Sequence, residues 1–199
     1  MDIAQQQDLP VGPGALWRAA LVMMAITLGL FGFGYSLVST GIDGALFPAQ
    51  AQGSIITRAG KPVASELVAQ PFAAARYFQP RPSAVKYDPM NAGGSNLART
   101  NPDLSKHIAE LRNVIAQRDG IAPTQVADDL LTQSGSGVDA DISVAAAEQQ
   151  VTRVARARGI SADALRQRVA ANITPPQFGV FGSPRINVVR LNLALDARR

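Results

Sequence analysis

The segment Ser134–Gly137, Ser-Gly-Ser-Gly, is the clearest candidate for chemistry in this sequence. Glycines in a loop expose backbone N–H groups that can hold an anion such as a phosphate. The segment lacks the Lys-Ser/Thr pair of a P-loop, and Ala140 stands where a Gly-x-Gly-x-x-Gly pattern needs glycine. A turn is therefore the favoured interpretation, with a nucleotide site as the alternative.

Other residues that could do chemistry are few. Asp139 and Asp141 are either paired carboxylates or part of an Asx-type turn leading into a helix, and the turn is favoured. Gly93–Asn96, Gly-Gly-Ser-Asn, is also interpreted as a turn. The chain has no cysteine and a single histidine, His107, which excludes a disulfide framework, a zinc finger and a Cys–His nucleophile. We predict no catalytic residue and no metal site, and assign His107 no role.

The elements that must position these residues begin with a membrane anchor. Charged residues make up only 17% of the chain, and the shortage is concentrated in residues 19–38, which carry no charge. Twenty helical residues span about 30 Å, the thickness of the hydrocarbon core of a bilayer. Trp17 and Arg18 supply an aromatic and a basic residue at its edge. We predict an N-terminal tail at residues 1–15 and a transmembrane helix at residues 16–38.

A cleaved signal peptide is the alternative to a retained anchor. The tripeptide Ala49–Ala51 resembles a cleavage site, but it lies more than ten residues beyond the apolar run. The run is also longer than the usual core of a signal peptide, so a retained single-pass anchor is favoured. Because Arg18 flanks the span and no further basic residue follows before Arg58, the positive-inside rule favours a cytoplasmic N-terminus and a domain outside.

Small residues recur along one face of this predicted helix. They lie at positions i, i+4, i+7 and i+11, namely Ala25, Gly29, Gly32 and Ser36. Such a stripe lets a second helix approach closely in lipid, which predicts a partner helix. The alternative is that glycine and alanine are simply frequent in membrane helices.

After a linker at residues 39–53, residues 54–199 are predicted to form one small α+β domain. We expect strands at 54–57 and 63–69, an irregular loop at 79–102, and a strand or helix at 126–132. Helices are expected at 102–119, 143–158 and 161–174, with Leu165, Val169 and Ile173 on the buried side of the last. The apolar alternation of residues 185–196 changes phase after Val188, which predicts a final strand with a β-bulge.

Charge is divided unevenly along the chain. Residues 1–148 carry a net charge of −3, whereas residues 149–199 carry +7. The arginines of the second part lie on the polar sides of predicted helices without interleaved aromatic residues, which is not typical of a nucleic-acid-binding surface. We predict no nucleic-acid partner; this face is solvated or meets an acidic partner or lipid headgroups.

An ordered series of motifs carries a family resemblance. The series is Gln70, Tyr77-Phe78, Arg81-Pro82-Ser83-Ala84, Gly93-Gly94-Ser95-Asn96-Leu97, Thr100-Asn101-Pro102, Ser134 to Asp139, Ile142-Ser143, Arg153 to Arg158, and Asn187-Val188 to Asp196. The sequence resembles the C subunit of the bacterial Kdp-type potassium-transporting ATPase from the anchor to Asp196. It departs where the family usually has proline, at Val144 and Thr152.

The resemblance implies a non-catalytic but essential subunit of a complex in the bacterial inner membrane. A channel-like A subunit carries potassium, and a P-type ATPase B subunit hydrolyses ATP. The family's proposed role for the C subunit is that of a catalytic chaperone, which raises the ATP affinity of the B subunit through a transient ternary complex without holding a tightly bound cofactor. In that role Ser134, Gly135, Ser136 and Gly137 resemble the signature loop of ABC transporters, with Gln150 as a further nucleotide contact.

The predicted topology conflicts with part of this role, because an external domain lies across the membrane from ATP. The domain would then act at the mouth of the potassium subunit, and any effect on ATP affinity would pass through helices. Both interpretations stay open at the level of the sequence. The alternative from another class is a free-standing membrane-anchored binding or sensor module.

Overall fold

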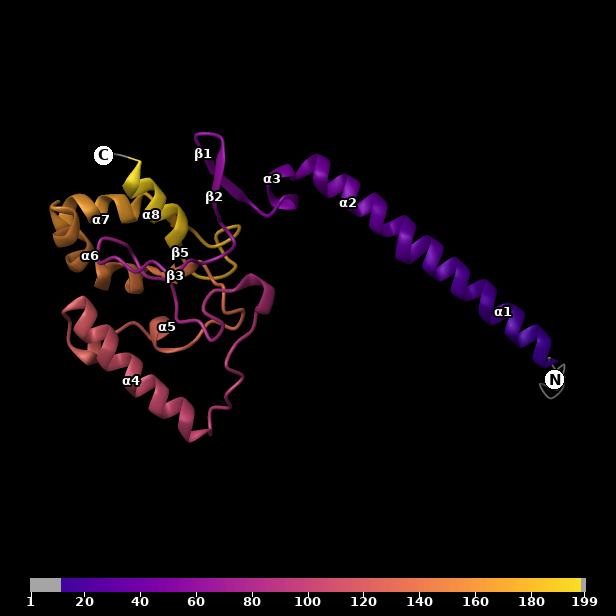
Figure 1. Ribbon diagram of the computed structural model, residues 1–199, viewed down its shortest axis with the longest axis horizontal. Coiled ribbons are helices and arrows are strands. Elements are labelled where there is room, and N and C mark those ends of the chain that lie inside the picture. The colour runs from indigo at the N-terminus through magenta and orange to yellow at the C-terminus, as the bar shows by residue number, and fades with distance from the viewer. Residues whose placement is uncertain (1–11, 198–199) are drawn as a thin grey trace, which may run out of the picture. The chain divides into compact units, whose positions relative to one another are not determined.

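The computed structural model describes residues 12–197, and its contacts divide the chain into two units between Gln52 and Gly53. The first unit is one long helix followed by a short one, and the second is a domain of helices and short strands (Figure 1). The predicted α+β class, with one N-terminal apolar helix followed by a small mixed domain, is confirmed.

The first unit contains one candidate membrane span, an unbroken helix over Pro13–Leu46 with a mean hydropathy of 2.0 in its most apolar part and no buried residues. It comprises α1 (Pro13–Ile26), a stretch at Thr27–Gly34, and α2 (Tyr35–Leu46). The helix therefore includes residues 39–46, which we had expected in a linker. It ends at Phe47 because Pro48, the first residue of α3 (Pro48–Ala51), disfavours helical backbone in the residue before it.

The stretch Thr27–Gly34 is wound as a π-helix, with the N–H of Tyr35 donating to the carbonyl of Leu30. A Cβ on Gly34 would lie 3.3 Å from the carbonyl oxygen of Gly29, so glycine suits this wider turn. The small-residue stripe assumes α-helical geometry along its whole length. The π-helical stretch changes the angle about the helix axis between Ala25, which precedes it, and Ser36, which follows it. The role of Ala25, Gly29, Gly32 and Ser36 as a packing face stays a prediction.

The domain opens with an antiparallel hairpin. Its strands are β1 (Ile55–Arg58) and β2 (Lys61–Ser65), joined by Ala59 and Gly60, both in the left-handed region. Two such residues form the type I′ turn that matches the twist of paired strands. The strand expected at 54–57 is confirmed within one residue, and the second strand lies earlier than the expected 63–69.

The helix expected at 102–119 is confirmed as α4 (Pro102–Asp119). The side chain of Asn101 accepts a hydrogen bond from the N–H of Asp103 and caps its start. Gly120 ends it in the left-handed conformation that glycine adopts without steric cost. The ambiguous segment 126–132 contains the single helical turn α5 (Asp128–Leu131).

Two further predicted helices are confirmed. Ser143 caps α6 (Val144–Arg158), and Gly159 ends it with positive φ. Ser161 caps α7 (Ala162–Ala170). The latter helix ends earlier than expected, and Ile173 lies in the short strand β4 (Ile173–Thr174) rather than on the helix.

The predicted final strand at 185–196 is wrong beyond Asn187. Only β5 (Arg185–Asn187) is extended, and the rest is helix α8 (Val188–Asp196). The side chain of Asn187 accepts from the N–H of Arg190 and caps this helix. The phase change that we attributed to a β-bulge is the transition from a two-residue period to a helical one, with Leu191 and Leu195 on the buried face.

The three-stranded sheet has the order β3-β5-β4, and β3 (Asp141–Ser143) and β4 each pair antiparallel to β5. Ile186 of β5 faces both Ile142 and Ile173. Side chains from the sheet and from α4 to α8 form the main core together with Phe78: Ile115, Leu130, Ile142, Val151, Val154, Leu165, Ile186, Val188 and Leu191.

Candidate functional site

The Ser134–Gly137 loop folds onto itself. The Ser134 hydroxyl accepts from the N–H of Gly137 at 3.1 Å and also bonds the Ser136 hydroxyl at 3.1 Å. The Ser136 hydroxyl accepts from the N–H of Val138 at 3.2 Å. The loop's own side chains thus satisfy two backbone N–H groups, at residues 137 and 138, that a phosphate cradle would direct at its ligand.

The same loop is clamped to the irregular segment that precedes α4. The N–H of Ser134 donates to the carbonyl of Pro82 at 3.0 Å, and the N–H of Gly93 donates to the carbonyl of Ser136 at 2.8 Å. The Ser83 hydroxyl donates to the carbonyl of Gly137 at 2.6 Å. The two glycine-rich segments that the sequence indicates as separate turns are therefore docked against each other.

Gly137 is the position in this loop that requires glycine. Its φ is 72°, and a Cβ would lie 2.4 Å from Cγ2 of Val85 and 2.5 Å from the carbonyl oxygen of Gly93. Gly135, by contrast, is exposed, has ordinary φ, and would place a Cβ in open space. Ser134 is buried and Ser136 is exposed, so only the middle of the loop is accessible to a ligand.

Ser136 borders a cavity of about 360 Å³. The charged side chains that line this cavity all form ion pairs. Arg185 lies 2.9 Å from Asp141, and the more distant Arg190 lies 3.6 Å from Glu66. Asp139 of the same cavity pairs with Arg81 at 3.2 Å. Three carboxylates against two guanidinium groups along the wall disfavour a triphosphate there. The N–H of Asp141 donates to the carboxylate of Asp139, which confirms the Asx-type turn.

Gln150 is fully buried on α6, with both ends of its amide occupied. Its Oε1 accepts from the N–H of Gln79 at 2.8 Å and from Arg153 at 2.7 Å, and its Nε2 donates to the carbonyls of Gln79 and Ala146. Gln150 and the Ser134–Gly137 loop thus both bond to the same irregular segment of the chain. Gln150 bonds to it at Gln79, and the loop bonds to it at Pro82. Both hold that segment in place.

A buried ion pair that the sequence analysis missed lies beside Gln150. The guanidinium of Arg153 is 2.7 Å from the carboxylate of Asp119, and their side chains are 9% and 0% exposed. Arg153 also donates to the carbonyls of Ala75 and Tyr77, at 2.6 and 3.0 Å. One arginine therefore ties α4 and α6 to the segment that carries Phe78.

Asp119 stays ionised despite its burial. Desolvation opposes its charge, but hydrogen bonds from Arg118, Gln149 and Arg153, and the charge of Arg118, outweigh it and hold its pKa below the usual range. No sequence signal joins the members of this cluster, because Asp119 and Arg153 are 34 residues apart in the chain. The one local sign is Asp119 itself, since an acidic residue at the C-terminal end of a helix opposes the helix dipole.

The C-terminal helix α8 is attached to the same extended segment. Asn192 is buried, and its amide exchanges two hydrogen bonds of 2.9 Å with the backbone of Phe78. Asp196 accepts from the Tyr77 hydroxyl at 2.7 Å and from Arg158 at 3.0 Å. Residues 75–83, which we call the strap, therefore receive side-chain or backbone bonds from α6, from α8 and from the Ser134–Gly137 loop.

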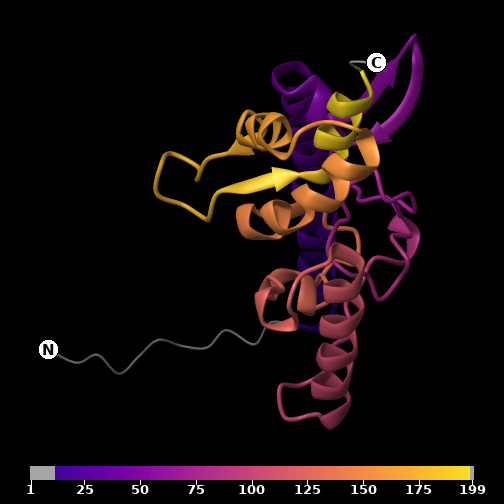
Figure 2. The ribbon, with the colours of Figure 1, turned by 90° about the vertical axis from the view of Figure 1, so that its left-hand side faces the viewer.

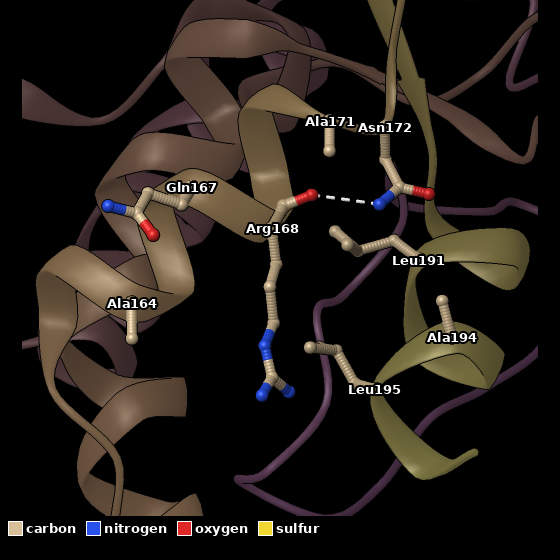
Figure 3. A pocket seen from close by; sticks show the side chains of 8 residues that line it. All are labelled: Ala164, Gln167, Arg168, Ala171, Asn172, Leu191, Ala194 and Leu195. Atoms are coloured by element: carbon tan, nitrogen blue, oxygen red, sulfur yellow. Dashed lines mark hydrogen bonds between the residues drawn. The ribbon is translucent and has the colours of Figure 1, made fainter. Parts of the chain in front are cut away.

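A cavity of about 460 Å³ lies away from all of the predicted site residues, between α7 and α8. Figure 3 shows the Arg168 side chain extending between Ala164 and Leu195, with Leu191 on the facing helix. Within residues 12–197 no cluster of three or more metal-binding side chains occurs, and His107 contacts only the amide of Gln133, at 3.3 Å, as a polar partner.

Comparisons with known proteins decide the family. The profile described as "K+-transporting ATPase, c chain" matches residues 17–197. The chain belongs to this family. It is 54% identical to the potassium-transporting ATPase KdpC subunit of Xanthomonas campestris pv. campestris strain B100, with 95% of this chain and 90% of the relative covered.

Similar proteins in other genera carry the same name. Identity is 49% to the KdpC subunit of Burkholderia vietnamiensis strain G4, with 92% of this chain and 96% of the relative covered. It is 46% to that of Shewanella putrefaciens strain CN-32, with 90% and 88% covered. The motifs that carry the family resemblance include Phe78 of the strap, and also Arg153 and Asn192, whose side chains bond to the backbone of the strap. The strap and these two partners therefore belong to the motifs by which the family is recognised.

Substituting the two loop glycines by alanine tests whether the fold requires glycine at Gly137 but not at Gly135. We expect Gly137→Ala to lower the free energy of unfolding by about 2 kcal/mol or more, because the new Cβ clashes with Val85 and the Gly93 carbonyl at a positive φ. Gly135→Ala is the matched control and should stay within about 0.5 kcal/mol of the parent. Thermal unfolding of the full chain measures both, and equal midpoints for the two variants would contradict the clamped-loop description.

The Asp119 ion pair predicts a pH dependence. Because its pKa is lower in the folded than in the unfolded state, its stabilisation is present above about pH 4 and is lost as the pH falls through the lower folded value. We expect Asp119→Asn to lower the unfolding midpoint at pH 7, with the difference from the parent shrinking below about pH 4. Asp163→Asn, whose parent carboxylate is 89% exposed, is the control. A constant difference across this pH range would exclude Asp119 as the titrating group.

Proposed function

We propose that this chain is a non-catalytic, essential subunit of a high-affinity ATP-driven potassium uptake complex. The observation that carries the proposal is the match of residues 17–197 to the family described as the c chain of a K+-transporting ATPase. The structure adds that the conspicuous polar residues, Gln150 and Asp119 among them, are engaged in holding the domain together. Such a domain acts by binding partners rather than by chemistry of its own.

We propose the channel-like A subunit and the ATP-hydrolysing B subunit of this complex as its partners. The helix Pro13–Leu46 has its side chains available for lipid and for neighbouring helices, since none of them is buried within this chain. Ala25, Gly29, Gly32 and Ser36 supply the small-residue face for close approach. The π-wound turn among them is a feature that occurs frequently at functional sites in helices.

We further propose that the chain lies in the bacterial inner membrane, with a cytoplasmic N-terminus and a periplasmic domain. The support is the charge distribution, with Arg18 before the span and Arg58 the next basic residue after it. In this orientation the domain is separated from ATP by the bilayer. An effect on the ATP affinity of the B subunit, the catalytic-chaperone role, would then be a coupling between distant sites through the membrane helix.

Direct contact with ATP in a ternary complex is the competing route for that role. It would use Ser134, Gly135, Ser136, Gly137 and Gln150. Three observations weigh against it: Gln150 is buried and fully bonded, Ser134 is buried, and the cavity at Ser136 carries more acidic than basic groups. Only Gly135 and Ser136 are exposed for such a contact, so the indirect route is the one we propose.

Replacing the small residues of the membrane face tests the subunit assignment. We expect Gly29→Leu combined with Gly32→Leu to release the chain from its partner subunits during purification in detergent, because bulky side chains prevent close helix contact. Gly41→Leu combined with Gly44→Leu, two glycines of α2 outside the stripe, is the matched control and should leave co-purification intact. If the Gly29→Leu, Gly32→Leu variant still co-purifies with the partner subunits, the small-residue stripe is not part of the subunit interface.

Fusing alkaline phosphatase after Asp196 tests the orientation. The enzyme folds to an active form outside the cytoplasm, since it needs disulfides that do not persist in the cytoplasm. We expect an active fusion in cells, with a fusion of the same enzyme before Pro13 inactive. The reverse pattern would place the domain beside ATP and revive the direct route.

A further inference from the structure

A cavity of about 310 Å³ lies between the last turn of α4, the second half of α6 and the start of the strap. The last turn of α4 meets α6, whereas the start of α4 extends away from α6 and α8 (Figure 2). The volume is at the lower end of the range typical of small-molecule sites, about 300–1,000 Å³. Neither Gln150 nor the Ser134–Gly137 loop lines this cavity, so it is separate from the residues considered for a nucleotide.

The charged side chains of this cavity do not balance. Among residues 12–197, Arg118, Arg153 and Arg156 line it together with a single carboxylate, that of Asp119. Asp119 accepts hydrogen bonds from both Arg118 and Arg153, so two guanidinium groups share one negative charge. Arg156 forms no ion pair within that part of the chain. Three guanidinium groups against one carboxylate leave an excess of two positive charges.

This excess charge is partly shielded from water. The side chain of Asp119 is fully buried and that of Arg153 almost so, Arg118 is 30% exposed, and Arg156 is exposed. Burial lowers the pKa of the Arg153 guanidinium; the hydrogen bond and charge of Asp119 oppose this, and the charge of Arg118 lowers the pKa further. A second anion beside these groups would relieve the repulsion between them, at a lower effective dielectric constant than that of bulk water.

Hydrogen-bond donors remain available for such an anion. Arg118 uses Nε and Nη2 for Asp119, and neither its Nη1 nor the guanidinium of Arg156 bonds to any other residue that the structure describes. Arg156 lies one turn after Arg153 on the same face of α6. A guanidinium group presents its N–H donors as a planar fork, which matches the oxygens of a phosphate or carboxylate group.

The rest of the cavity wall is small or polar. It consists of Ala75, Gln117, Gly120, Thr152 and Ala157. No large apolar or aromatic side chain lines the cavity among the described residues, whereas such side chains are enriched at the core of protein interfaces. A small anion therefore fits this cavity better than a segment of a partner protein.

We propose that this cavity binds a small soluble divalent oxyanion of the phosphate class. Two negative charges match the excess of two positive charges, and the oxygens accept from the guanidinium groups of Arg118 and Arg156. The anion bridges α4 and α6 beside the Asp119–Arg153 pair. Because it binds the folded domain and not the unfolded chain, it stabilises the contact that positions the strap.

Thermal unfolding of the full chain in detergent tests this site with inorganic phosphate. For a Kd of about 1 mM, about 10 mM phosphate at about pH 8 should raise the unfolding midpoint by about 3–6 °C relative to sodium chloride of equal ionic strength. Arg156→Gln should lose most of this shift, because it removes one guanidinium group without breaking an ion pair. Arg156→Lys keeps the charge but not the fork, so it should keep only part of the shift.

The control is Arg99→Gln, which changes an exposed arginine that does not line the cavity and should keep the full shift. Phosphate also stabilises proteins by being excluded from their surface, but that effect is the same in the parent and in all variants. An equal shift in the parent and in Arg156→Gln overturns the proposal. So does a shift produced by acetate at equal ionic strength and not by phosphate, since the cavity then receives a carboxylate, as on an acidic side chain of a partner subunit.

Discussion

The fold of the domain depends on a charge that cannot be left unpaired in its interior. Asp119 is buried at the end of α4, and Arg153 of α6 meets it while also holding the carbonyls of Ala75 and Tyr77. Removing one partner of a buried pair leaves an uncompensated ion, at a typical cost of about 3–5 kcal/mol. The position of the strap relative to both helices follows from this one contact.

The strap in turn connects the rest of the domain. The side chain of Phe78 lies in the core. The backbone beside it is held by two side chains, Asn192 at Phe78 and Gln150 at Gln79. The far end of the strap supports the Ser134–Gly137 loop through Pro82 and Ser83. The strap is an irregular segment with two prolines, so it cannot form the regular backbone hydrogen bonds of a β-strand. Side chains from α6 and α8 bond to its backbone N–H and carbonyl groups instead, which satisfies these groups without regular structure.

Local signals in the sequence predicted the parts of the fold that depend on local physics. Caps such as Ser143 and stops such as Gly120 lie where the helices begin and end, because capping involves residues only a few positions apart. The α8 helix was missed because the apolar residues around Val188 fit both an alternating and a helical pattern. The clamps could not be predicted: Asn192 meets Phe78, and Arg153 meets Asp119, across sequence separations of 114 and 34 residues. The loop glycines are marked by their local pattern and Gln150 only by the family resemblance, and the long-range contacts of both, which decide what they do, could not be predicted.

The attachment of α8 to the strap also fixes the order of events during biosynthesis. Tyr77 and Phe78 find their partners in Asp196 and Asn192, and Arg58 of the first strand donates to the carbonyl of Leu193 at 2.9 Å. These partners lie 114 to 135 residues further along the chain, so they leave the ribosome well after the residues that they hold. The early part of the domain therefore remains without its closing helix until α8 has been synthesised, long after the apolar helix has emerged. A prematurely terminated chain would retain its anchor but expose an unfinished core, which marks it for removal by proteases.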